Sequence, residues 1–315
     1  MGFTSVASPH KECVSSLALN MDETLLCSTS LDSTIALFDT STIQCVTCFK
    51  GHKDAINHVL FLSALNDCFS FVTASDDRTV LRWDSRSPSI PVSIFSNFSD
   101  GINKVSFSPS GHFFASAADD GKVYMHSVGD GKLVDSFFAS SSTVNDVIVL
   151  PTCIVTSGED CSVRYWSPQV QRVVDEEGNE QEERLLESLD MFENPVNHIA
   201  FYGGRLYAAC SECLISIEVD PTTAIAKQGE ESNVGIFAKH QDYIRGIGFG
   251  GGVMVTVSDD GTAVEWDPLN ANCLRSSKIH DDCVMAMELA ARSDSLISGC
   301  NDSSIRIWSL PLSSK

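Results

Sequence analysis

The chain has 315 residues, of which 43% are hydrophobic and 20% are charged, a composition typical of a folded globular protein. Its 42 acidic and 21 basic residues give a formal net charge of −21, which argues against direct binding to nucleic acid or to an anionic membrane. The 12 cysteines show no regular disulfide spacing and Met1–Ser8 lacks a signal-peptide pattern, so we expect reduced, buried thiols in a protein of the cytoplasm or the nucleus.

Short apolar segments separated by polar turns begin near His10 and continue along the chain. In the first unit, which ends near Phe49, they predict strands at Val14–Leu19, Thr24–Ser30, Ser33–Asp39 and Ile43–Phe49. The second unit, His52 to Phe95, shows the pattern most clearly: the apolar run Phe71–Ser75, a polar turn and the β-branched run Thr79–Trp83 predict a β-hairpin. One hairpin cannot bury its apolar faces alone, so we expect a row of copies.

The later units begin at Ile102, Val144, Val196, His240 and His280. A turn aspartate marks six units and recurs at intervals of 45, 43, 40, 100 and 42 residues, at Asp32, Asp77, Asp120, Asp160, Asp260 and Asp302. The long interval holds one further copy, Leu206–Val219, which raises the number of units to seven. All four tryptophans of the chain fall on one position of the unit, the end of the second hairpin strand.

This repeat resembles the WD-repeat (WD40) β-propeller family over nearly the whole chain. The residues that carry the resemblance are Gly51-His52 with Trp83-Asp84, His240 with Trp266-Asp267, and His280 with Trp308-Ser309. The resemblance implies an all-β fold, a seven-bladed β-propeller of four-stranded antiparallel blades, as a single domain over residues 1–315. Unit seven has only three strands of its own, so we expect Gly2–Ala7 to pair with it and close the ring.

A His, a Ser or Thr, an Asp and a Trp recur together in units two, six and seven. These sets are His52, Thr73, Asp77, Trp83; His240, Thr256, Asp260, Trp266; and His280, Ser298, Asp302, Trp308. Three copies in different blades cannot form one active site, so we predict no catalytic residues and no enzyme. The resemblance implies that each set is a buried hydrogen-bond network.

Two Cys-x-x-Cys pairs, Cys45/Cys48 and Cys210/Cys213, could suggest a zinc site, which needs four convergent ligands. The pairs fall in units one and five, far apart in a ring. Residues i and i+3 of one strand also point to opposite faces, as we expect for Cys45 and Cys48. We therefore predict neither a metal site nor a cofactor.

The resemblance also places three positions per blade at the mouth of the ring. The candidate partner-binding residues at this top face are Asn57, Asn103, Asn145, Asn197, Arg245, Tyr243, Asp76, Asp119, Glu159 and Asp259. The acidic ones also suit a turn, where Asp is common. Asn is a poor strand residue, so four in register need a reason. Either they hydrogen-bond to neighbouring blades, or they read the backbone of a ligand.

These features favour a non-enzymatic scaffold or subunit of a multiprotein complex, itself monomeric, which binds a basic peptide segment of another protein at the top face. The alternative is a substrate receptor of a cullin-type ubiquitin ligase, because Phe71–Arg86 resembles the box that ends in Trp-Asp-x-Arg, with Arg86 as the adaptor contact. An acidic insertion, residues 169–190, is either a solvated loop or extended hairpin turning at Glu177-Gly178-Asn179, or a docking arm for a basic partner.

Overall fold

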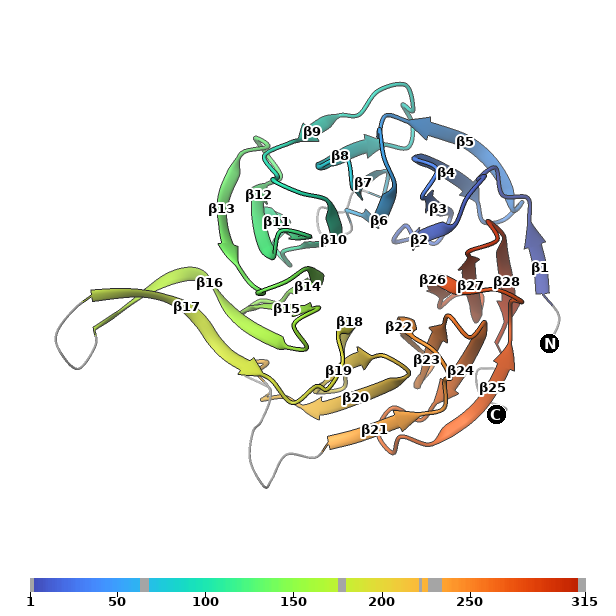
Figure 1. Cartoon of the computed structure of the whole chain (residues 1–315). Coiled ribbons are helices and arrows are strands. Elements are labelled where there is room, and N and C mark those ends of the chain that lie inside the picture. Colours follow the sequence, from blue (N-terminus) through green and yellow to red (C-terminus); the bar gives the residue numbers. More distant parts are fainter. Residues whose placement is uncertain (1–2, 63–67, 175–179, 221–222, 226–233, 311–315) are drawn as a thin grey trace.

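The computed structural model describes residues 3–62, 68–174, 180–220, 223–225 and 234–310, and across these ranges it forms seven four-stranded antiparallel sheets arranged in a ring (Figure 1). We number the sheets as blades one to seven. In blades one to six the first strand in the chain lies nearest the centre of the ring and the last lies at its outer edge (Figure 1). The predicted seven-bladed propeller is confirmed.

The strands of the first four blades follow chain order from the inside outwards. Blade one contains β2 (Val14–Leu19), β3 (Leu25–Ser30), β4 (Thr34–Asp39) and β5 (Gln44–Lys50), and blade two contains β6 (Ile56–Phe61), β7 (Ser70–Ser75), β8 (Thr79–Asp84) and β9 (Ser93–Phe95). Blade three contains β10 (Ile102–Phe107), β11 (Phe113–Ala118), β12 (Lys122–Ser127) and β13 (Leu133–Phe138), and blade four contains β14 (Val144–Val149), β15 (Ile154–Gly158), β16 (Val163–Val174) and β17 (Glu180–Leu189).

The last three blades repeat this order, except that blade seven takes its outer strand from the start of the chain. Blade five contains β18 (Val196–Tyr202), β19 (Arg205–Cys210), β20 (Cys213–Glu218) and β21 (Val234–Ala238), and blade six contains β22 (Ile244–Gly250), β23 (Val253–Ser258), β24 (Thr262–Trp266) and β25 (Cys273–Lys278). Blade seven contains β26 (Val284–Ala290), β27 (Ser295–Cys300), β28 (Ile305–Ser309) and β1 (Phe3–Val6).

The core is divided among the interfaces between neighbouring blades. Between blades one and two, the fully buried Trp83 packs against Phe49 of β5 at 5.5 Å between ring centroids and against Phe71 of β7 at 6.5 Å. Strands alternate their side chains between two faces, so each blade buries one face against the blade before it and the other against the blade after it. Every blade therefore depends on two neighbours, as the sequence repeat predicts.

The ring closes through the N-terminal strand. Strand β1 pairs with β28 in antiparallel register from Phe3 opposite Trp308 to Val6 opposite Ile305. The Phe3 ring also lies 4.8 Å from the Trp308 ring, between centroids, and Val6 is buried between blades seven and one. The predicted closure is confirmed, although Gly2 lies outside the described residues.

Deleting residues 1–8 is expected to lower the melting temperature by about 5 °C or more and to promote aggregation. The deletion removes the β1 ladder and exposes the backbone groups of β28 as an open edge. Thermal melting followed by light scattering measures both effects. Phe3→Ser is the milder control, because it removes the stacking on Trp308 and keeps the strand. A deletion variant that melts like the unchanged protein would contradict this account of closure.

The acidic insertion forms the outer part of blade four as an extended hairpin. Strands β16 and β17 pair from Val163 opposite Leu189 to Val174 opposite Glu180, and they reach beyond the ring (Figure 1). At its base, the Arg184 guanidinium is paired with Asp135 of blade three and lies 4.6 Å from the centre of the Phe137 ring. The predicted turn at Glu177-Gly178-Asn179 lies outside the described residues.

Candidate functional site

A cavity of about 420 Å³ lies at the centre of the ring, where the innermost strands approach one another. Of the predicted top-face residues, it is lined by Asn57, Asn103, Asn145, Asn197, Arg245 and Glu159. Tyr243 precedes β22 and is 41% exposed. The remaining three, Asp76, Asp119 and Asp259, follow the second strands of blades two, three and six. We call this set of residues the mouth.

Three of the four mouth asparagines join consecutive blades. Each occupies a β-bulge at the start of an innermost strand: Ile56 lies opposite Ser75 and His58 opposite Ala74, so Asn57 has no cross-strand partner. The Asn57 side-chain amide donates to the Ile102 carbonyl oxygen of the next blade at 3.1 Å. The same bond links Asn103 to Val144 at 3.0 Å and Asn145 to Val196 at 3.2 Å.

The same three amides also hold the acidic residues of their own blades. Nδ2 of Asn57 lies 2.5 Å from Asp76, that of Asn103 lies 2.9 Å from Asp119, and that of Asn145 lies 3.1 Å from Glu159. Of the two roles left open by the sequence, the structure therefore gives these three asparagines the first, bonding to neighbouring blades. Arg245 likewise pairs with Asp259, at 2.6 Å between Nη2 and Oδ2.

Asn197 differs from the other three. Blade five carries Cys210 where blades two, three and four carry an acidic residue, and its thiol donates to the Asn194 carbonyl oxygen at 3.2 Å. Nδ2 of Asn197 is consequently buried without a hydrogen-bond partner among the described residues. A buried donor without an acceptor costs about 1–3 kcal/mol. Asn197 also lines the central cavity.

Two carboxylates converge on the other side of the mouth, over Gly101. A Cβ atom at Gly101 would lie 2.9 Å from an Asp119 oxygen and 3.0 Å from an Asp76 oxygen, so a side chain at this position would collide with both. Burial raises the pKa of Asp76, and the nearby charges of Asp119, Asp54 and Asp100 raise it further, against the opposing hydrogen bond from Asn57. The local potential is therefore strongly negative and favours a cation.

The His–Thr–Asp–Trp sets of blades two and six are brought together as hydrogen-bond networks. In blade two, His52 lies 2.9 Å from Asp77 and 2.7 Å from the Thr73 hydroxyl, which also accepts from the Trp83 indole N–H at 2.9 Å. In blade six, the corresponding distances among His240, Asp260, Thr256 and Trp266 are 3.2, 2.7 and 2.8 Å. The histidines, threonines and tryptophans of both sets are buried, in separate blades, so the sets act as structural ties.

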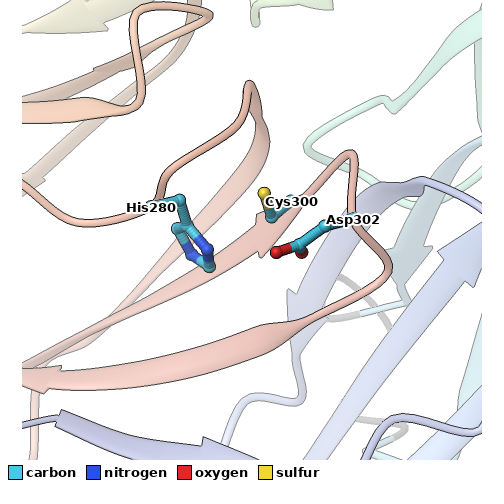
Figure 2. A group of neighbouring side chains, drawn as sticks. All are labelled: His280, Cys300 and Asp302. Atoms are coloured by element: carbon cyan, nitrogen blue, oxygen red, sulfur yellow. The ribbon is translucent and has the colours of Figure 1, made fainter.

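The third set, in blade seven, is looser. His280 lies 2.7 Å from the Ser298 hydroxyl, which accepts from Trp308 at 3.0 Å, but its Nδ1 faces the Ser304 hydroxyl at 3.3 Å. Figure 2 shows His280 and Asp302 pointing toward one another beside Cys300 at the end of β27.

His280, Cys300 and Asp302 bring their potential metal-ligand atoms within 4.8 Å of one another. Blade two has His52, Ser75 and Asp77 at the same positions, so the grouping follows from the repeat. Burial lowers the pKa of His280 to about 4 and raises that of Cys300 to about 12, so the cysteine is a neutral thiol at pH 7. We assign the group to the hydrogen-bond network of the blade.

A second layer of polar residues lies beneath the mouth, and our reading of the sequence missed it. In four consecutive blades, the residue after the mouth asparagine is titratable: His58, Lys104, Asp146 and His198. Oδ2 of Asp146 lies 2.5 Å from Nδ1 of His198, 3.0 Å from the Ile199 amide nitrogen and 3.8 Å from the Lys104 ammonium. The sequence could have revealed this layer, because a titratable residue recurs directly after each of the four asparagines.

Asp146 is the anionic centre of this layer. Burial raises its pKa, but the opposing effects of Lys104 and His198 are stronger together and lower the pKa to about 2. Burial and the charge of Lys104 lower the pKa of His198, so its imidazole is neutral. The layer is thus an ion pair of Lys104 and Asp146 with a neutral histidine bridging blades four and five.

Arg86, the predicted adaptor contact, lies beyond the end of β8 that is opposite Asp76. Its guanidinium is paired with Asp84, at 2.6 Å between Nη2 and Oδ2, and lies 4.5 Å from the centre of the Phe69 ring. Its side chain is 62% exposed. The ubiquitin-ligase alternative stays a hypothesis, because these contacts hold the side chain at the surface without identifying a partner.

Comparison with known families matches four segments of the chain, residues 3–39, 43–84, 89–127 and 271–309, to the family described as "WD domain, G-beta repeat". Each segment starts at or near the outermost strand of one blade and ends at or near the third strand of the next. The chain belongs to the WD40 repeat family. This stagger means that each WD40 repeat joins two blades.

Curated relatives of this WD40 propeller include the guanine nucleotide-binding protein subunit beta of Zea mays, which is 33% identical over 42% of the chain and 36% of that protein. The nuclear distribution protein PAC1 of Arthroderma otae is 21% identical over 96% of the chain and 59% of that protein. The chain thus spans less than two thirds of the length of these relatives. Within the ranges that the structure describes, no helix has the length and apolar composition needed to cross a membrane.

Proposed function

We propose that this WD40 propeller is a non-enzymatic interaction scaffold, or a subunit of a multiprotein complex, that binds a basic peptide segment of another protein at the mouth. WD40 propellers are typical of protein-interaction scaffolds, and the maize relative is by its name one subunit of a larger protein. The observation that carries the proposal is the convergence of the Asp76 and Asp119 carboxylates over Gly101.

The positive charge of an Arg or Lys side chain would offset the two converging carboxylates. Asp76 and Asp119 lie close to each other and to Asp54 and Asp100, and the resulting repulsion is relieved when a cation enters. A guanidinium can also donate hydrogen bonds to both carboxylates, which makes the contact charge-assisted.

The remaining mouth residues complete the proposed recognition of an extended segment. Asn197 belongs to β18, which lies across the centre of the ring from β6 of blade two (Figure 1), and its amide, which has no partner among the described residues, can serve a backbone carbonyl oxygen. In blade six, the exposed Tyr243 ring carries the Arg245 guanidinium at 5.5 Å from its centre, which provides a flat surface for a partner side chain. Asn57, Asn103 and Asn145 hold the acidic residues in place.

Asp119→Ala is expected to weaken binding by about 2–5 kcal/mol if the ion pair with the partner is buried, and by less than about 1 kcal/mol if it is exposed. Peptides selected for binding to the purified protein should carry Arg or Lys, and their affinity should fall as salt rises. Calorimetric titration of one selected peptide against the wild type and the variant measures the effect.

Two further variants make this test specific. Asp130→Ala removes the same charge from the turn between β12 and β13, at the other end of the blade, and should bind normally. Asn103→Ala also loses the bond to Val144, so its melting temperature is measured before its affinity. If neither Asp119→Ala nor Asn103→Ala changes the affinity, the mouth is structural only and the proposal fails.

A further inference from the structure

Two cysteines of blade one lie side by side on its outer surface. Cys45 and Cys48 belong to the outermost strand, β5, both are exposed, and their Sγ atoms are 3.8 Å apart. Two expectations from the sequence were therefore wrong: these thiols are not buried, and they do not point to opposite faces of the strand. The spacing of three residues predicts opposite faces only for a regular strand.

A β-bulge explains the contact. Cys45 lies opposite Phe38 of β4, but Thr47 lies opposite Leu37 and Cys48 opposite Ala36, so Val46 is an extra residue in β5. Directly opposed residues of an antiparallel pair share a face, and Ala36 and Phe38 share a face because they are two apart. The bulge thus moves Cys45 to the face that Cys48 occupies.

We propose that Cys45 and Cys48 form a reversible dithiol–disulfide site whose co-reactant is a small oxidised disulfide of the glutathione type. One cysteine thiolate attacks a sulfur of the small disulfide, forms a mixed disulfide with the protein and releases one small thiol. The second cysteine then attacks the protein-bound sulfur, forms the Cys45–Cys48 bond and releases the second small thiol. Two protein thiols are oxidised, one small disulfide is reduced, and the two thiol protons leave on the released molecules.

The position of the pair permits this reaction. A disulfide requires the sulfurs to approach from 3.8 Å to about 2.05 Å. Strand β5 is the edge of its blade and pairs only with β4, so the backbone around Val46 can adjust without breaking a second ladder. Partial desolvation at the strand surface and the neighbouring Cys48 raise the pKa of Cys45 to about 11, so exchange should accelerate as pH rises and more thiolate forms.

The second Cys-x-x-Cys pair is a matched internal control. Cys210 and Cys213 have the same spacing and lie directly opposite each other in blade five. However, Cys210 is buried and its sulfur donates to the Asn194 carbonyl oxygen. An oxidant from solution should therefore react with Cys45 and Cys48 and leave Cys210 as a thiol.

The test incubates the full chain with a mixture of oxidised and reduced glutathione, blocks the remaining thiols with N-ethylmaleimide and analyses the digested peptides by mass spectrometry. The peptide that contains Cys45 and Cys48 is expected to lose two hydrogen atoms and to carry neither glutathione nor maleimide. Dithiothreitol should reverse this loss. In Cys45→Ser and Cys48→Ser, the remaining cysteine should instead retain one glutathione, because no second thiol displaces it.

Two results would overturn the proposal. One is a wild-type peptide in which both cysteines carry maleimide while the single-serine variants accept glutathione. The other is a wild-type peptide that carries two glutathiones, which would show two independent exposed thiols. Both substituted positions are exposed on an edge strand, so the variants should fold, and a thermal melt verifies this.

Discussion

Asp146→Ala is expected to lower the free energy of unfolding by about 3–5 kcal/mol, because it leaves the Lys104 ammonium without its counter-ion inside the ring. It also removes the acceptor of the Ile199 backbone amide and the partner of His198, so these bonds between blades four and five are lost while that of Asn145 to Val196 stays. Asp146 is fully buried, so water does not reach it to compensate for its loss. Urea unfolding measures the effect.

A charge-free variant separates the ion pair from the loss of packing. In Asp146→Leu/Lys104→Met both charges are absent, so the double variant should recover much of the stability that Asp146→Ala loses. Asp130→Ala serves as the surface control and should unfold at nearly the same urea concentration as the wild type. If Asp146→Ala is as stable as Asp130→Ala, the layer beneath the mouth does not hold the ring together.

Lowering the pH from about 6.5 to about 4 is expected to cost about 2–3 kcal/mol of stability through His126 alone. This histidine occupies the tryptophan position of blade three. It is fully buried among Phe95, Phe98 and Phe114, and both its ring nitrogens lack a partner among the described residues. Burial lowers its pKa from 6.5 to about 4.

The sign follows from which state binds the proton. Between pH 6.5 and pH 4 the unfolded chain protonates His126 and the folded chain does not, so acid favours unfolding. The stabilisation by neutral His126 is complete above pH 6.5 and is lost as the pH falls toward 4. Burial also lowers the pKa of His280 to about 4, so the contribution of His126 is read as a difference between variants.

His126→Phe should reduce the acid sensitivity and raise stability near pH 5. Phenylalanine extends the aromatic cluster and removes two buried nitrogens that lack partners. His112→Gln, on the exposed turn after β10, removes one histidine without changing the core and should keep the wild-type pH profile. Melting temperatures measured from pH 4 to pH 8 test this assignment. If the melting temperature of His126→Phe falls with pH as steeply as that of the wild type, the acid-sensitive group lies elsewhere.

The fold was predictable because the same pattern of strands and turns recurs along the sequence, once for each blade. The tryptophans and turn aspartates fix the register of the hairpins that carry them, and a shift by one residue would turn every apolar side chain outward. The short seventh unit even predicted that β1 pairs with β28. The alternation of apolar residues and the spacing of the repeats are therefore sufficient to predict the blades, the ring and its closure.

The details of the candidate site depended on irregularities that spacing cannot reveal. Val46 is not marked as a bulge residue by its chemistry, so the contact between Cys45 and Cys48 was missed. The asparagines were noticed as poor strand residues, but only the bulges at the inner strands show that three of them reach the next blade. The depth of Asp146 also follows from the meeting of innermost strands from different blades, which one sequence does not display.

The pairing of β1 with β28 has a consequence for how the molecule is made. During synthesis Phe3–Val6 emerges before every other described strand, yet its partner Ile305–Ser309 emerges after all of them. The strand must therefore remain unpaired while six blades form, and bringing it back requires the closure of a very long loop. Contacts this distant in sequence slow folding, so we expect β1 to dock on β28 only after the other described strands have formed their blades.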